Sequence, residues 1–214
     1  MADHIQQESV QIPIGDILLD GFMAMPTTGK GLVIFAHGSG SGRLSPRNQF
    51  VAQVLRAKGL VTLLFDLLTE EEDRVYENRF NINLIADRLT QATAWLLNNP
   101  ENKELRVGYF GASTGAAAAL QAAAYMPDPV KAIVSRGGRP DLAMPTLPQV
   151  KAPTLLIVGG NDDVVITLNQ QAYDALQVEK KLLVIPGATH LFEETGALET
   201  VAEAAGEWFV KYLE

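Results

Sequence analysis

The chain has 214 residues, a length that fits one domain with a sizeable hydrophobic core, spanning residues 1–214. Its 17 Lys and Arg against 25 Asp and Glu give a formal net charge of −8, which disfavours nucleic acid and anionic membrane surfaces as partners. The chain has no cysteine, which excludes disulfide bonds, thiolate metal ligands and a cysteine nucleophile.

The first quarter of the chain predicts an antiparallel hairpin, a buried strand and a helix. Residues 9–14 and 16–25 alternate between apolar and polar side chains, and Gly15 lies between the two segments. Residues 31–36 are apolar throughout, as expected of a strand that is covered on both faces. Ser45, followed directly by a proline, is typical of a helix start.

Strand and helix patterns alternate through the rest of the chain. The acidic run at 70–73 indicates a solvated surface loop, and residues 139–150, with three prolines, leave room for a loop rather than a helical lid. This order predicts a three-layer α/β fold with a mostly parallel central sheet, in which ligands bind beyond the carboxyl ends of the strands. We expect strands at 60–65, 105–110, 130–135, 154–158 and 181–185, and helices around 85–96, 116–124, 168–176 and 198–212.

A serine motif, G-x-S-x-G, joins one predicted strand to the next helix. Gly111 and Gly115 flank Ser113, and glycines at these places allow the strand and helix to approach closely around a strained turn. The alternative role for Ser113 is a helix N-cap, which serine favours. The strand–turn–helix context favours a nucleophile whose hydroxyl projects beyond the end of the sheet.

A serine nucleophile needs an adjacent base, and histidine is the natural base near neutral pH. The chain has three histidines. His4 is in the N-terminal tail and His37 precedes a glycine-rich loop, so we expect His190, which follows the last predicted strand, to be the base.

A carboxylate that orients this histidine is expected after the preceding strand. Asp162 and Asp163 both follow that strand, and the residues alone do not choose between them. One of these two aspartates is expected only to stabilise the turn. Asp66 and Glu193 are weaker candidates for the acid. Asp66 follows a strand that comes before Ser113, which breaks the chain order Ser-Asp-His, and Glu193 is expected to begin the last helix.

An acyl-transfer intermediate also needs backbone N–H groups around its negative oxygen. One donor is expected to be the amide of Thr114, and the second the amide of Ser39 in the glycine-rich loop at 38–42. The alternatives for this loop are a flexible connection or a phosphate-binding loop. The sequence lacks the Walker pattern and a supported G-x-G-x-x-G dinucleotide motif, which weakens the nucleotide alternative.

Taken together, these segments resemble the α/β-hydrolase superfamily and, more narrowly, the dienelactone hydrolase family. The resemblance covers nearly the whole chain and includes His37-Gly38, the Ser113 turn, and residues 156–162 and 186–190. It implies a catalytic acid three residues after the first glycine of the G-G-x-D turn, which favours Asp162. The family's enzymes proper use a cysteine nucleophile, whereas this chain has serine, so a serine carboxylesterase of the same superfamily is the implied activity.

Basic residues near the predicted site are candidates for substrate binding. Arg136 and Arg139 end one strand, and Arg43 and Arg47 border the glycine-rich loop. Arginine can bind a substrate carboxylate through two parallel hydrogen bonds, and the alternative is a structural salt bridge. We retain Arg136, Arg43 and His37 as possible substrate-binding residues.

The expected function is hydrolysis of a small-molecule carboxylic ester by a serine hydrolase without metal or cofactor. Alternatives are a thioesterase or lysophospholipase, a lactone hydrolase, or a non-catalytic binding protein of the same fold. No apolar run approaches the roughly 20 residues that span a bilayer. The first eight residues also lack the pattern of a signal peptide, so a cytoplasmic location is expected. The sequence does not indicate the oligomeric state.

Overall fold

The computed structural model describes residues 6–26, 29 and 31–214. Within them one eight-stranded sheet has the order β1-β2-β4-β3-β5-β6-β7-β8. The first two strands form the predicted antiparallel hairpin, β2 pairs antiparallel with β4, and every later pair is parallel. The strands are β1 (Gln6–Ile14), β2 (Ile17–Met25), β3 (Gly31–Ala36), β4 (Val61–Phe65), β5 (Arg106–Ala112), β6 (Val130–Arg136), β7 (Thr154–Gly159) and β8 (Lys180–Ile185).

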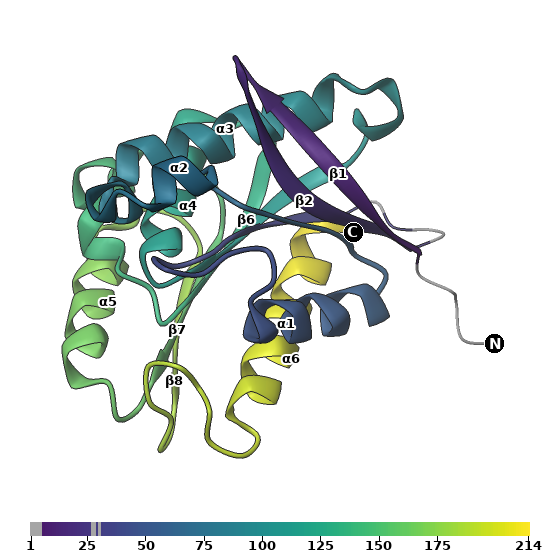
Figure 1. The fold of residues 1–214 in the computed structure, drawn as a ribbon. Helices are drawn as coiled ribbons and strands as arrows, with labels where there is room; N and C mark the ends of the chain where they lie inside the picture. Colours follow the sequence, from purple (N-terminus) through teal and green to yellow (C-terminus); the bar gives the residue numbers. More distant parts are fainter. Residues whose placement is uncertain (1–5, 27–28, 30) are drawn as a thin grey trace.

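Helices cover both faces of this sheet (Figure 1). Two separate apolar clusters result, one under α1 and α6 and the other under α3, α4 and α5. The α-helices are α1 (Pro46–Ala57), α2 (Glu70–Asp73), α3 (Ile82–Asn98), α4 (Thr114–Tyr125), α5 (Asp163–Ala175) and α6 (Ala197–Leu213), and the 3-10 helices are η1 (Tyr76–Phe80), η2 (Pro100–Asn102) and η3 (Pro140–Gln149). No helix among the described residues is long and apolar enough to cross a membrane.

The helix after Ser113 is buried along most of its length. In α4 the residues from Thr114 to Ala123 are all buried, and most of them are alanine. Small side chains let this helix pack close to β5 and α3, at the density of a protein interior. The start of α4 is therefore held firmly beneath the carboxyl edge of the sheet.

Three expectations from the sequence need correction. Residues 70–73 form the short helix α2, because Thr69 and Glu72 make a reciprocal capping box and Glu72 also pairs with Arg88 at 2.6 Å. The segment expected to be a loop after β6 is mostly the 3-10 helix η3. Helix α5 begins at Asp163, five residues before the expected start, because burial of Val165 offsets the low helix propensity of its β-branched first turn.

Candidate active site

Ser113 lies on a sharp turn between β5 and α4. Its backbone has φ +51° and ψ −120°, a conformation that is strained for any residue with a side chain. A Cβ atom on Gly111 would lie 2.4 Å from the Cα of Ala116, and one on Gly115 would lie 2.1 Å from the carbonyl oxygen of Ala36. Only glycine fits at these two positions, which is why the motif has this spacing.

The neighbouring strand end holds the turn in place. The Ser113 N–H donates to the carbonyl of Arg136 at 3.2 Å, and the Arg139 N–H donates to the carbonyl of Ser113 at 3.1 Å. Ser113 occupies the N-cap position of α4, but its side chain makes no capping hydrogen bond. The N-cap alternative therefore does not account for this serine.

His190 and Asp162 come together at the ends of the last two strands. The distance from His190 Nδ1 to Asp162 Oδ2 is 2.7 Å, and the Asp162 side chain is mostly buried. Asp163 instead begins α5. The structure therefore pairs His190 with the aspartate that the family resemblance favoured.

The two weaker candidates for the acid have other partners. The Asp66 carboxylate accepts hydrogen bonds from the backbone N–H and the guanidinium of Arg43. Glu193 pairs with Arg47 at 3.0 Å and lies before α6, so the expectation that it begins the last helix is wrong. His4 lies outside the described residues.

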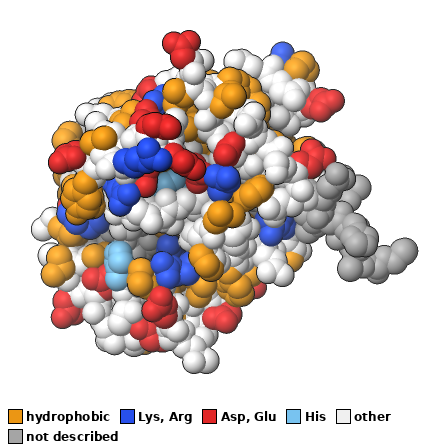
Figure 2. Space-filling view, viewed as in Figure 1, with side chains coloured by type: hydrophobic (Ala, Val, Ile, Leu, Met, Phe, Trp, Pro, Cys, Tyr) orange, Lys and Arg blue, Asp and Glu red, His pale blue; other side chains and the backbone are white. Residues whose placement is uncertain are grey.

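Ser113 and His190 border the same cavity, whose volume is about 250 Å³. Among the described residues, no hydrogen bond joins their side chains. Figure 2 shows this face of the molecule, where basic side chains lie close to histidine among scattered acidic and apolar groups. The cavity is lined by Gly38, Ser39, Ser41, Ser45, Arg47, Ala112, Ser113, Arg136, His190 and Leu191.

The two predicted backbone donors lie next to one another. Thr114 is the first residue of α4, so its N–H is one of the helix-terminal donors that has no partner within the helix. The Ser39 N–H donates to the Thr114 hydroxyl oxygen at 2.9 Å. An oxyanion at this position would have to compete with that hydroxyl for the Ser39 N–H.

The arginines near the site differ in their partners. Arg139 makes a two-pronged pair with Asp141, at 2.9 and 2.8 Å. Arg136 borders the cavity and is only 7% exposed, and burial, followed by the charge of Arg47, lowers its pKa to about 10. Arg47, which lies beside the glycine-rich loop in the sequence but is not among the predicted substrate-binding residues, also borders the cavity.

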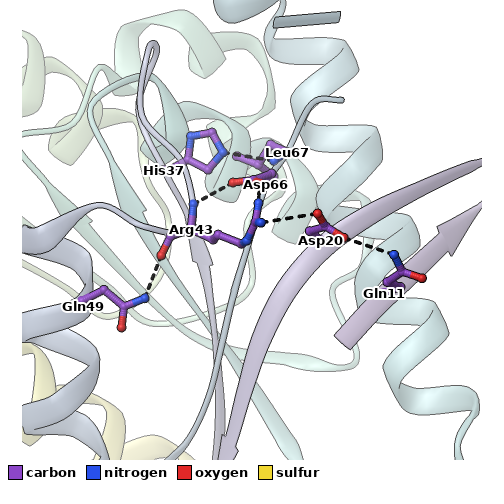
Figure 3. A network of polar contacts seen from close by, with 7 residues as sticks. All are labelled: Gln11, Asp20, His37, Arg43, Gln49, Asp66 and Leu67. Carbon is purple, nitrogen blue, oxygen red and sulfur yellow. Dashed lines mark hydrogen bonds and ion pairs between the residues drawn. The ribbon is translucent and has the colours of Figure 1, made fainter. Parts of the chain in front are cut away.

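His37 and Arg43 lie at a second cavity, of about 600 Å³, on the other side of the glycine-rich loop. The Arg43 guanidinium lies between the carboxylates of Asp66 and Asp20, and His37 Nε2 accepts the Leu67 N–H at 3.0 Å (Figure 3). Burial lowers the pKa of His37, which favours the neutral ring. The structure therefore does not place these two candidates beside Ser113.

The residues from 19 to 214 match the model of the dienelactone hydrolase family. The crystal structure of a dienelactone hydrolase from Anabaena variabilis is 55% identical, covers 98% of this chain and 99% of its own, and superposes with a TM-score of 0.95. Est1E from Butyrivibrio proteoclasticus shares the fold at 17% identity, with a TM-score of 0.77 over 95% of this chain and 98% of its own.

A longer relative also matches nearly the whole chain. A Mycobacterium tuberculosis protein named "Putative phosphoribosyl transferase" is 54% identical over 209 residues, which make up 98% of this chain and 47% of that protein. The chain thus spans about half the length of this curated relative.

Proposed function

The chain belongs to the dienelactone hydrolase family, and we propose that it is a serine hydrolase that cleaves carboxylic esters of small to medium acyl chain. The observation that carries this proposal is the arrangement at one small cavity. Ser113 lies there on a strained turn, and His190, hydrogen-bonded to Asp162, borders the same space. A serine, a histidine and a buried carboxylate arranged in this way are the parts of a catalytic triad, in which the histidine activates the serine hydroxyl as a nucleophile.

The pairing with Asp162 determines which nitrogen of His190 acts as the base. A carboxylate accepts from Nδ1–H, which leaves Nε2 of the neutral ring with a free lone pair. In the proposed reaction Nε2 takes the Ser113 hydroxyl proton as the serine oxygen bonds to the ester carbonyl carbon. The protonated ring then gives this proton to the leaving alcohol, and an acyl-serine remains.

Water completes the cycle by the same steps. His190 removes a proton from water as its oxygen attacks the acyl carbon, and the proton returns to Ser113 when the acid is released. The Thr114 N–H at the start of α4 would stabilise the negative oxygen in both halves, and the Ser39 N–H would join it after leaving the Thr114 hydroxyl. A donor of this kind contributes ~3–4 kcal/mol to transition-state stabilisation.

Thioesters and lactones are the nearest alternative substrates, because the same acyl transfer would serve them. A non-catalytic binding protein is the alternative of another class. Strain at Ser113 favours catalysis, since a binding role does not require φ +51° at a residue with a side chain. We propose no phosphoribosyl transferase activity for this chain, because the chain matches less than half of the protein that has this name.

Labelling with a fluorophosphonate probe tests the proposal directly, because only an activated serine reacts readily with it. We expect one adduct per chain, located to the peptide that contains Ser113 by mass spectrometry, and none after Ser113→Ala. Absence of labelling in folded wild-type protein would reject the serine-hydrolase function. Initial rates with p-nitrophenyl acetate, acetyl-CoA and a simple lactone would then rank ester, thioester and lactone substrates.

A further inference from the structure

The cavity at Ser113 is bordered by a buried positive charge that has no partner in the described part of the chain. Arg136 is the last residue of β6, and among the described residues its guanidinium makes no hydrogen bond or ion pair. Its Nε atom is fully buried, and the group lies 5.9 Å from the centre of the Phe192 ring. An unpaired buried charge is costly, so a protein that retains one has a use for it or fills the site with a ligand.

A second guanidinium reaches the same cavity from another element. Arg47 is the second residue of α1, and its Nε is also buried without a partner. One nitrogen, Nη1, pairs with Glu193, whose side chain is 65% exposed. Exposed pairs of this kind are weak, which leaves Arg47 free to turn to a ligand.

The end of α1 at this cavity is also positive. The helix has 12 residues and no acidic side chain in its first turn, so its N-terminal dipole is not offset there. The Ser45 hydroxyl oxygen accepts the Asn48 N–H at 3.4 Å, and its O–H remains available to donate. The described residues that border the cavity include no aspartate or glutamate.

We propose that this end of the cavity binds a phosphate monoester group carried by the ester substrate, with Arg136 and Arg47 as its ligands. The proposal rests on the proposed function and specifies its substrate class. A phosphate monoester has three terminal oxygens and up to two negative charges, so it can take donors from β6 and from the start of α1 at once. A carboxylate, which is planar and singly charged, would be satisfied by one arginine.

Calorimetric titration of the wild-type protein with phenyl phosphate tests the subsite without requiring turnover. We expect binding at one site per chain, weakened at least 30-fold by Arg136→Met and about tenfold by Arg47→Met. The matched control is Arg139→Gln, which removes a nearby charge that is already paired with Asp141, and we expect its affinity to stay within twofold of wild type.

A substitution that strengthens binding gives a sharper test than one that weakens it. Glu193→Gln removes the carboxylate that competes for Arg47, so we expect phenyl phosphate to bind two- to fivefold more tightly. A purely structural role of the two arginines predicts no such gain. This variant and Arg47→Met also carry the test if Arg136→Met fails to fold.

Competition between different ligands shows which chemical group this subsite binds. Phenyl phosphate should compete with p-nitrophenyl acetate at lower concentrations than benzoate does, and inorganic phosphate should compete in the same arginine-dependent way. Benzoate binding as tightly as phenyl phosphate would overturn the phosphate assignment, and so would binding that is indifferent to both arginines.

The two proposals fail in different ways. Labelling of Ser113 by a fluorophosphonate without arginine-dependent phosphate binding rejects only the subsite. Phosphate binding that depends on both arginines, in a protein whose Ser113 does not label, rejects the serine-hydrolase function and leaves a phosphate site without an ester substrate.

Discussion

Two cavities lie on either side of the glycine-rich loop, and they differ in how their charges are satisfied. In the larger one Arg43 lies between two carboxylates and both nitrogens of His37 have a backbone partner. In the smaller one Arg136 has no partner among the described residues and the Ser113 hydroxyl caps nothing.

The comparison teaches that volume alone does not single out the cavity that we propose to be reactive. The larger cavity, at about 600 Å³, is more than twice the size of the one at Ser113, yet its arginine is paired with two carboxylates and its histidine with two backbone groups. Groups that are paired within the protein stabilise the fold, whereas groups left unpaired at a cavity are available to a substrate. This difference leads to four predictions, in which changes at the smaller cavity abolish turnover and changes at the larger one lower stability.

The largest effect is expected from Ser113→Ala. Loss of the nucleophile should lower kcat/KM for p-nitrophenyl acetate by roughly 10⁵–10⁶-fold, the order found when a serine-hydrolase nucleophile is removed. The melting temperature should not fall, because this hydroxyl makes no hydrogen bond to any other residue that the structure describes. The control is Ser9→Ala, an exposed serine on β1, and we expect wild-type kinetics from it. If turnover by Ser113→Ala stayed within tenfold of wild type, Ser113 would not be the nucleophile.

Two adjacent aspartates provide a matched pair for the second prediction. Asp162→Asn should reduce kcat by about 10³–10⁴-fold, because the amide cannot hold His190 in the tautomer that leaves Nε2 free. Asp163→Asn should change kcat less than threefold, since that side chain only begins α5. Steady-state kinetics on both variants check this. Equal losses of kcat in the two variants would show that the hydrogen bond between Asp162 and His190 does not contribute to turnover.

The sheet and the serine turn could be predicted because their signals are local. Apolar runs at strand spacing and the glycines around Ser113 act within a few residues, and a turn this tight admits little else. The short helix at 70–73 has a local signal in the capping-box spacing of Thr69 and Glu72, which the acidic composition of the run obscured, whereas the pairing of Glu72 with Arg88 on a later helix has no local signal. Domain count and cellular location stay predictions.

Roles of the four arginines near the site could not be predicted, for the same reason. Arg43, Arg47 and Arg136 all lie at the end of a strand or loop of the expected kind, and nothing local separates them, whereas Arg139 has an aspartate two residues later. Only the folded arrangement shows that Arg43 and Arg139 are matched with aspartates while Arg136 is not. For Arg43 and Arg47 the partner lies on a distant segment, so sequence neighbours could not reveal it, whereas Arg139 pairs with Asp141 two residues later.

The third prediction concerns the larger cavity. Arg43→Met leaves Asp66 and Asp20 without their cation and should lower the free energy of unfolding by about 1–2 kcal/mol, since all three groups are partly exposed to water. Turnover should fall less than tenfold, through small shifts of the adjoining loop. Urea unfolding and p-nitrophenyl acetate rates measure the two quantities. A 100-fold loss of kcat/KM at unchanged stability would instead support the sequence-based prediction that Arg43 binds substrate.

The smallest effect is expected from the pH dependence of stability at His37. Burial lowers the pKa of this histidine in the folded state below its usual value of about 6.5, so the unfolded chain binds more protons as the pH falls through that value. The stabilisation is therefore fully present above about pH 6.5 and is lost as the pH falls toward the lowered pKa.

His37→Gln tests this assignment, because its side-chain oxygen can still accept the Leu67 N–H and does not titrate. Between pH 7.5 and 5.5 the wild type should lose more stability than the variant, with a difference in slope of at most about 1.4 kcal/mol per pH unit. Urea unfolding at several pH values measures it. Parallel curves for the two proteins would mean that His37 becomes protonated in the folded state as readily as in the unfolded one, which would contradict the effect of burial at the larger cavity.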